Sequence, residues 1–169
     1  MSTFETLSFY RGISATHEVD NPLVLTPRRN RRPRNSPASF HTIADQWFSS
    51  NFGIPYRSHG LFVTSDKFIA SNYAANPSHV TRIVPLSSYK FCWSPRVRDL
   101  LFAAQQLAKA PATEIFKYFD TLDYCEGNLE KAHELQHEVM LSCSLYVAIP
   151  IGLLGEDLPS SSPSIILPA

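Results

Sequence analysis

Nine residues, His133-Glu134-Leu135-Gln136-His137-Glu138-Val139-Met140-Leu141, decide between two folds for this chain. If the segment is one continuous helix, His133 and His137 lie one turn apart on the same face. If a helix ends near His137, Glu138 instead opens an apolar run that is typical of a buried strand. The first interpretation predicts a metal site, and the second places a carboxylate at the start of a strand.

The composition indicates one globular domain with a sizeable core. The chain has 169 residues, of which 44% are hydrophobic and 12% aromatic. Fifteen basic residues balance fifteen acidic ones, so the net charge points to no partner. The three cysteines, Cys92, Cys125 and Cys143, form no CxxC pair and are expected to be buried free thiols.

The N-terminus, Met1-Ser2-Thr3-Phe4-Glu5, has neither the basic nor the apolar region of a secretory signal. No apolar run reaches the length that spans a membrane. We therefore expect a soluble protein of the cytoplasm. A protein delivered into the cytoplasm of a target cell by machinery that needs no such signal would have the same features.

Residues 20–37 are expected to form a loop, because they are rich in proline, arginine and asparagine. The loop carries five arginines, which cannot pack against one another and are expected in solvent: Arg28, Arg29, Arg31, Arg32 and Arg34. Two interpretations stay open, a mobile exposed loop or a surface that contacts nucleic acid or another acidic partner.

Hydrophobic periodicity predicts strands and helices without regular alternation, which indicates an α+β fold. Strands are predicted at residues 6–13, 60–65, 80–86, 89–93, 139–143 and 145–149, the last two paired with each other. Helices are predicted at residues 39–52, 67–75, 95–109, 112–119 and 129–134, the first capped by Ser39 and ended by Gly53. The domain is expected to span residues 1–150, and the Pro/Ser-rich residues 151–169 to form an extended or disordered tail.

The metal interpretation rests on the pattern His133-Glu134-x-x-His137. Two histidines on one helix face can share a Zn²⁺ ion, and Glu134 between them can act as general base on a bound water. Two observations weigh against it: the run after His137 suits a strand, and no histidine follows that could be a third ligand. A zinc-dependent hydrolase stays the runner-up hypothesis. The alternative without a function for this segment is an ordinary charged helical turn in solvent.

Three separated elements, in this order, resemble the R-S-E class of mono-ADP-ribosyltransferases. Phe9-Tyr10-Arg11-Gly12-Ile13 resembles the arginine strand of that family. Gly60-Leu61-Phe62-Val63-Thr64-Ser65 resembles its Ser-Thr-Ser strand, with Val63 in place of the first serine. Gln136-x-Glu138 resembles the catalytic glutamate and the residue two before it, which contributes to acceptor choice. The resemblance covers about residues 10–150.

This resemblance implies an ADP-ribosyltransferase-like α+β fold, with two packed, mostly antiparallel sheets, flanking helices and an NAD cleft. It implies a toxin- or effector-like enzyme of the glycosyltransferase class, which moves one ADP-ribose from NAD to a macromolecule and releases nicotinamide. NAD is then the expected cofactor, as substrate, and no metal is expected. The acceptor is a protein side chain or a nucleic-acid base, and an antitoxin or chaperone fits such a setting as a partner.

The chemistry of NAD gives the matched residues their expected roles. Arg11 offers a planar fork of donors to phosphate or ribose oxygens. Glu138 stabilises the positive charge that develops on the ribose as nicotinamide leaves. The resemblance, rather than the chemistry of NAD, implies that Gln136 orients an acceptor other than arginine. With the basic loop, this makes nucleic acid a serious option.

Further residues are expected beside NAD. Thr64 and Ser65 are expected to hold the Glu138 carboxylate and line the nicotinamide pocket. Tyr10 and Tyr73 either stack on nicotinamide or belong to the core, and Gly12, on the arginine strand, is expected to contribute to NAD binding. A third hypothesis is a non-enzymatic module that binds nucleic acid through the five loop arginines.

Overall fold

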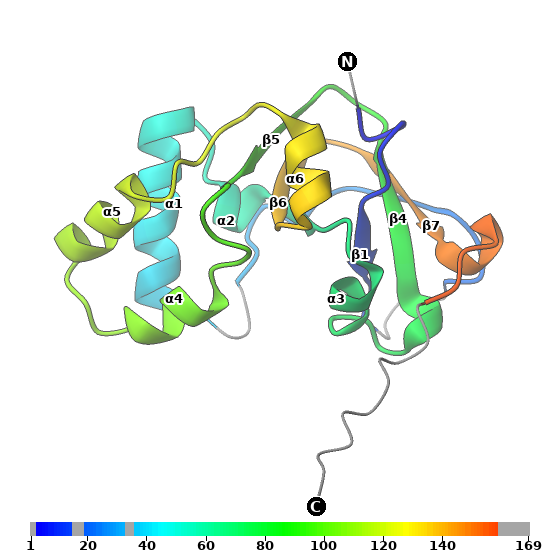
Figure 1. The fold of residues 1–169 in the computed structure, drawn as a ribbon, viewed down its shortest axis with the longest axis horizontal. Helices are drawn as coiled ribbons and strands as arrows, with labels where there is room; N and C mark the ends of the chain where they lie inside the picture. Colours follow the sequence, from blue (N-terminus) through cyan, green and yellow to red (C-terminus); the bar gives the residue numbers. More distant parts are fainter. Residues whose placement is uncertain (1–2, 15–18, 33–35, 159–169) are drawn as a thin grey trace, which may run out of the picture.

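Two antiparallel sheets form the centre of the computed structural model, which describes residues 3–14, 19–32 and 36–158. Figure 1 shows the strands and the helices that flank them. The four-stranded sheet has the order β1 (Tyr10–Gly12), β4 (Val80–Pro85), β7 (Tyr146–Pro150) and β2 (Leu23–Leu25). The three-stranded sheet has the order β3 (Leu61–Val63), β6 (Val139–Cys143) and β5 (Tyr89–Trp93). The α+β class with two antiparallel sheets and flanking helices is thus confirmed.

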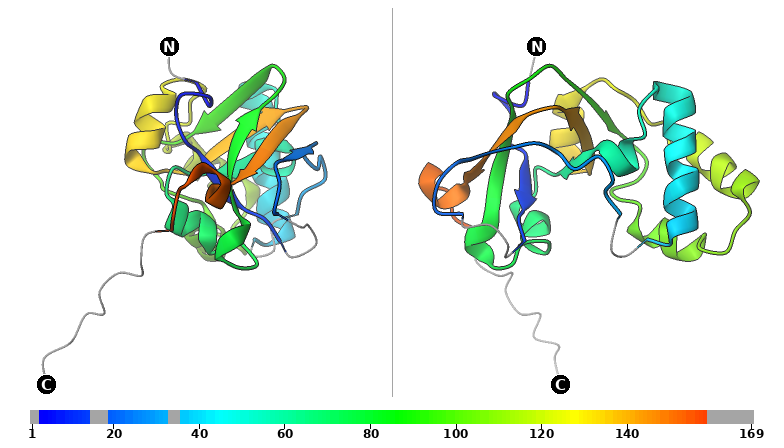
Figure 2. Two further views of the ribbon diagram at one scale, coloured as in Figure 1. Left: turned by 90° about the vertical axis from the view of Figure 1, so that its right-hand side faces the viewer. Right: turned by 180° about the vertical axis from the view of Figure 1, so that it is seen from behind.

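The helices gather in two groups on either side of the three-stranded sheet, as Figures 1 and 2 show. One end of the molecule holds α1 (Ala38–Phe52), α4 (Leu101–Gln106) and α5 (Ala112–Asp120), with α2 (Tyr56–His59) and α6 (Leu129–Leu135) nearer the centre. The other end holds α3 (Lys67–Ser71) and the 3-10 turns η1 (Pro77–His79) and η2 (Ile151–Leu154). None of the helices in the described ranges is both long and apolar enough to cross a membrane.

The strand β6 is buried on both faces, which explains its continuous apolar sequence. Val139 and Leu141 pack into the core between the two sheets, together with Phe9 and Ile83. Met140 points the other way, into an aromatic core formed largely by α1 and α5. The three cysteines are free, as predicted, but only Cys92 is fully buried.

The predicted pairing of the last two strands is wrong, because β6 and β7 belong to different sheets. The chain leaves one sheet for the other at Ser144 and Leu145, whose backbone N–H groups donate to Ser87 Oγ at 3.1 and 3.3 Å. Ser87 lies where β4 leads into β5, so the crossing from β4 to β5 and the crossing from β6 to β7 meet at one hydroxyl. The alternation of hydrophobic residues predicts which side chains are buried, but it does not identify the strand with which a given strand pairs.

Several predicted boundaries moved, and strand β2 lies within residues 20–37, which were expected to form a loop. Helix α1 begins at Ala38, so Ser39 is not its cap, whereas Gly53 ends it in the left-handed conformation, with φ 73°. Asp66 caps α3 through hydrogen bonds from Phe68 and Ile69 N–H. The predicted helix 95–109 shortens to α4, because Ser94 Oγ accepts the N–H groups of residues 96 and 97 in a turn instead.

The tail begins later than predicted, because residues 151–158 belong to the folded domain. Ile151 is buried beside Tyr10 and Val80, and the Glu156 carboxylate accepts a hydrogen bond of 2.6 Å from Tyr10 Oη. Lys67 Nζ lies 3.3 Å from the same carboxylate oxygen. The remaining tail, residues 159–169, lies outside the described residues.

Candidate active site

Hydrogen bonds join the three sequence elements that resemble the transferase motifs. The strands β1 and β3 meet at an isolated bridge, in which Tyr10 N–H donates to Thr64 O at 2.7 Å and Thr64 N–H to Tyr10 O at 3.0 Å. The bridge places Arg11 beside β3, where its Nη1 donates to Phe62 O at 3.1 Å. Thr64 Oγ1 and Ser65 Oγ donate to the carbonyls of Gln136 and His133, so the segment before Glu138 is held to the same strand.

The stretch 133–141 folds as a helix followed by a strand. Helix α6 ends at Leu135, and Gln136 adopts the left-handed conformation, with φ 57°, which turns the chain out of the helix. Glu138 N–H then donates to Arg98 O at 2.8 Å, and β6 begins at the next residue. This arrangement fixes the Glu138 carboxylate at the mouth of β6, with 24% of its side chain exposed.

The helical face that the zinc hypothesis requires does not form. The His133 ring packs edge-on against Phe9, with ring centroids 5.4 Å apart. His137 lies beyond the helix end, where its Nδ1 is 2.8 Å from Ser94 O. Glu134 is exposed and pairs with Lys131 at 3.3 Å. Within the described ranges, no three His, Cys, Asp or Glu side chains are grouped to hold a metal ion.

Arg57 is the partner of Glu138, and the sequence analysis missed it. Its Nη1 lies 3.0 Å from Glu138 Oε1, and the residue is only 4% exposed. Asp45 on α1 fixes the position of Arg57, because Asp45 Oδ1 accepts the N–H groups of Arg57 and Ser58 at 2.8 and 3.1 Å. The one signal in the sequence is the place of this arginine, three residues before Gly60 opens the β3 motif.

Arg31 points into the same site, so the expectation that all five loop arginines are in solvent is wrong. Its guanidinium carbon lies 3.8 Å from the centre of the Phe62 ring, and that of Arg57 lies 4.3 Å from the same centre. Arg31 N–H also donates to Ser58 O at 3.2 Å, which ties the loop to α2. The cation–π contact with Phe62 thus partly compensates for the cost of burying the Arg31 charge. Arg28, Arg29 and Arg32 are exposed, and Arg34 lies outside the described residues.

The charges at the site leave an excess of positive charge around one carboxylate. Burial raises the pKa of Glu138 above its ordinary value, while Arg57 and Arg31 act to lower it. Burial, together with the neighbouring Arg11 and Arg57, lowers the pKa of Arg31 to about 9. Nη1 of Arg31 and Nε of Arg57 are buried without a hydrogen-bond partner. Buried donors of this kind favour an anionic ligand, which would satisfy them.

Tyr10 and Gly12 have structural contacts in this fold, which for Tyr10 agree with the core alternative. Tyr10 is 5% exposed, its ring packs in the core, and its hydroxyl is bound to Glu156. Gly12 allows α3 to approach β1, because a Cβ at this position would lie 2.4 Å from Ala70 O and from Ala74 N. Tyr73 differs from Tyr10: it is 61% exposed and within electrostatic reach of Glu138, Arg31 and Arg57.

The hydroxyls of Thr64 and Ser65 bind backbone carbonyls rather than the Glu138 carboxylate that they were expected to hold. They act on Glu138 indirectly, by fixing the turn that precedes it. Gln136, two residues before the carboxylate, is exposed. Its left-handed backbone is uncommon for a residue with a side chain, and strain of this kind is often found beside functional groups.

Comparison with protein-family models, with curated proteins and with solved structures found no match to this chain. The chemistry of the site therefore rests on its own geometry. A half-buried carboxylate held at a strand start can stabilise a positive charge that develops on a substrate. Three converging guanidinium groups can bind the phosphates of the same substrate.

Proposed function

We propose that this protein is an NAD-dependent mono-ADP-ribosyltransferase, which transfers ADP-ribose to a macromolecular acceptor and releases nicotinamide. One observation carries the proposal. Arg11, the Thr64-Ser65 pair and Glu138 come from separated parts of the chain, and hydrogen bonds through Phe62, Gln136 and His133 bring them to one site. The cationic surroundings of Glu138 suit a diphosphate. A metal-free hydrolase that acts on neutral substrates would not need such surroundings.

In the proposed reaction, the bond between ribose C1′ and the nicotinamide nitrogen breaks, and the electron pair leaves with nicotinamide. Glu138 stabilises the positive charge that develops on the ribose, through a hydrogen bond from the 2′-hydroxyl. An acceptor nucleophile forms the new bond to C1′, and its proton passes to solvent. Arg57 contacts Glu138 through Oε1, which keeps the carboxylate ionised and oriented while Oε2 faces the ribose.

The other site residues bind and orient in this scheme. Arg11 and Arg31 bind phosphate oxygens, and the exposed Tyr73 ring stacks on nicotinamide. Gln136, at the surface beside Glu138, positions the acceptor. An Arg11→Ala variant should therefore raise KM for NAD more than it lowers kcat.

The test is release of nicotinamide from labelled NAD by purified protein, with and without cell lysate. Glu138→Gln should lower the rate by roughly 10²–10³-fold, because it removes charge stabilisation of the transition state. Glu134→Gln is the matched control: this glutamate lies four residues earlier, is exposed, and should leave the rate unchanged. Full activity in Glu138→Gln would end the proposal. Loss of activity in Glu134→Gln together with about one bound zinc per chain would establish the zinc hydrolase instead.

A further inference from the structure

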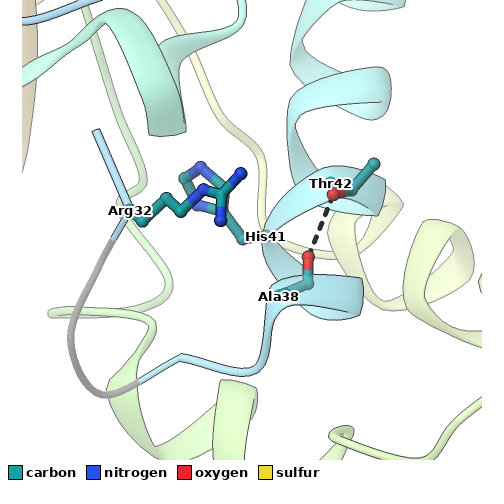
Figure 3. Close-up of a pocket in the computed structure, with 4 residues that line it drawn as sticks. All are labelled: Arg32, Ala38, His41 and Thr42. Atoms are coloured by element: carbon teal, nitrogen blue, oxygen red, sulfur yellow. Dashed lines mark hydrogen bonds between the residues drawn. The ribbon is translucent and has the colours of Figure 1, made fainter. Parts of the chain in front are cut away.

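A second basic pocket lies beside the site, at the N-terminal end of α1. It has a volume of about 150 Å³ and is lined by Arg32, Ala38, His41 and Thr42. Figure 3 shows Arg32 extending from the loop and His41 from the helix toward one another across this space. Neither residue belongs to the Arg11, Arg31 and Arg57 group at Glu138.

The start of α1 is an uncapped helix end. The helix has 15 residues, Pro37 supplies no side-chain hydrogen bond, and the first turn contains no acidic residue. The first N–H groups of a helix have no partner within it, and the helix dipole adds a positive potential at the same end. Such an end attracts an anion where other groups also point to it.

His41 is the independent indication of a ligand. The residue is 9% exposed, and its Nδ1 is buried without a hydrogen-bond partner. The Arg31 carbonyl nevertheless lies close enough to favour the protonated ring. His41 Nε2 lies 3.5 Å from Asp45 Oδ2, so Nδ1 can donate to a ligand when the ring is protonated. Burial lowers the pKa of His41, and the charges of Arg57 and Arg31 lower it further, whereas Asp45 and the Arg31 carbonyl act to raise it. An anion bound in the pocket would raise this pKa and so favour the protonated ring.

We propose that this pocket binds a phosphate group, through the Arg32 guanidinium, His41 Nδ1–H and the free N–H groups of α1. The surrounding sequence favours a phosphate of a nucleic-acid chain. Residues 21–44 contain five arginines and neither aspartate nor glutamate, and Arg28, Arg29 and Arg32 are exposed. The pocket itself stands without the proposed reaction. The identification of this nucleic acid as the acceptor of ADP-ribose, by contrast, rests on the proposed reaction.

Asp45 connects the pocket to Glu138. One of its oxygens faces His41, and the other accepts the N–H of Arg57, whose guanidinium holds Glu138. A phosphate in the pocket would therefore lie on one side of Asp45 and the reacting carboxylate on the other. This arrangement suits an acceptor that is anchored by one phosphate while a neighbouring base reaches the ribose.

The first arm of the test titrates the protein with inorganic phosphate at constant ionic strength and measures Tm at each concentration. Wild type should show a saturable rise, and Arg32→Gln should need about tenfold more phosphate. Ala38→Glu places a carboxylate at the exposed helix start, so it should fold as well as wild type and lose the response. Arg29→Gln, an exposed arginine of the same loop outside the pocket, should respond as wild type.

Equal phosphate responses in wild type, Arg32→Gln and Ala38→Glu would overturn the pocket and place any anion at the Arg11, Arg31 and Arg57 group. The second arm measures binding of a single-stranded RNA oligonucleotide to the Glu138→Gln protein, without NAD, as a function of salt. Arg32→Gln should reduce the salt slope by about one phosphate contact. An unchanged slope would overturn the nucleic-acid source and leave a small phosphate ligand, whatever the outcome of nicotinamide release.

Discussion

Arg57 and Glu138 form an ion pair of 3.0 Å, although 81 residues separate them in the chain. The two side chains come from different secondary structures: Arg57 from the short helix α2 and Glu138 from the residue before β6. Arg57 is 4% exposed, so its charge is compensated by protein rather than by water. The pair connects the position of α2 to the chemistry that we propose for Glu138.

The first prediction concerns stability. Arg57→Gln should lower the free energy of unfolding by about 1–3 kcal/mol, because it leaves a half-buried carboxylate without its cation. Arg96→Gln is the matched control: its pair with Asp123 is shorter, 2.7 Å, but exposed, and should be worth at most about 1 kcal/mol. Urea denaturation of both variants measures the difference. Equal losses would show that Arg57 contributes no more than a surface charge.

The second prediction concerns pH. Nicotinamide release requires ionised Glu138, and burial raises the pKa of this carboxyl above the ordinary value of 4.5. The rate should therefore fall on acidification at a higher pH than for an ordinary glutamate. Arg57 lowers this pKa, so its loss in Arg57→Gln should move the acid limb upward. The pH profile of kcat/KM gives both values, and an acid limb that stays in place in the variant would contradict the assigned role.

A third prediction tests the reassigned role of Gly12. Gly12→Ala should destabilise the protein by about 1–3 kcal/mol, because the new methyl group meets backbone atoms of α3 that cannot turn aside. Gly127→Ala provides the comparison, since a Cβ there meets nothing within 4 Å. Thermal unfolding of the two variants gives the answer. A well-folded Gly12→Ala protein with a raised KM for NAD would restore the original assignment to the cofactor.

The fourth prediction separates the two tyrosines. Tyr73→Ala should raise KM for NAD several-fold, because it removes an exposed ring beside the arginines. Tyr10→Phe should leave KM unchanged and cost about 1–2 kcal/mol of stability, through loss of the hydrogen bond to Glu156. Steady-state kinetics and denaturation on the same preparations decide the matter. A KM effect confined to Tyr10→Phe would reverse the assignment.

Local patterns in the sequence predicted most of the elements, though not β2 or α2, and some of the ends that a single residue fixes. Gly53 ends α1 because glycine adopts the left-handed conformation at little cost, and Asp66 caps α3 because its carboxylate reaches two free N–H groups. The apolar run from Val139 predicts β6 because both of its faces are buried. The order of Arg11, Thr64-Ser65 and Glu138 was likewise sufficient to suggest that they share a site.

Only the tertiary structure decided the partners. Strand β7 pairs with β4 and β2 rather than with its neighbour β6, and these partners lie far away in the sequence. Whether Arg31 is in water or against Phe62, and whether Tyr10 faces a ligand or the core, depends on strands that no local pattern identifies. Arg57 has no periodicity to mark it. Its significance comes from a charge on a distant segment, because electrostatic and packing energies depend on distance in space rather than in sequence.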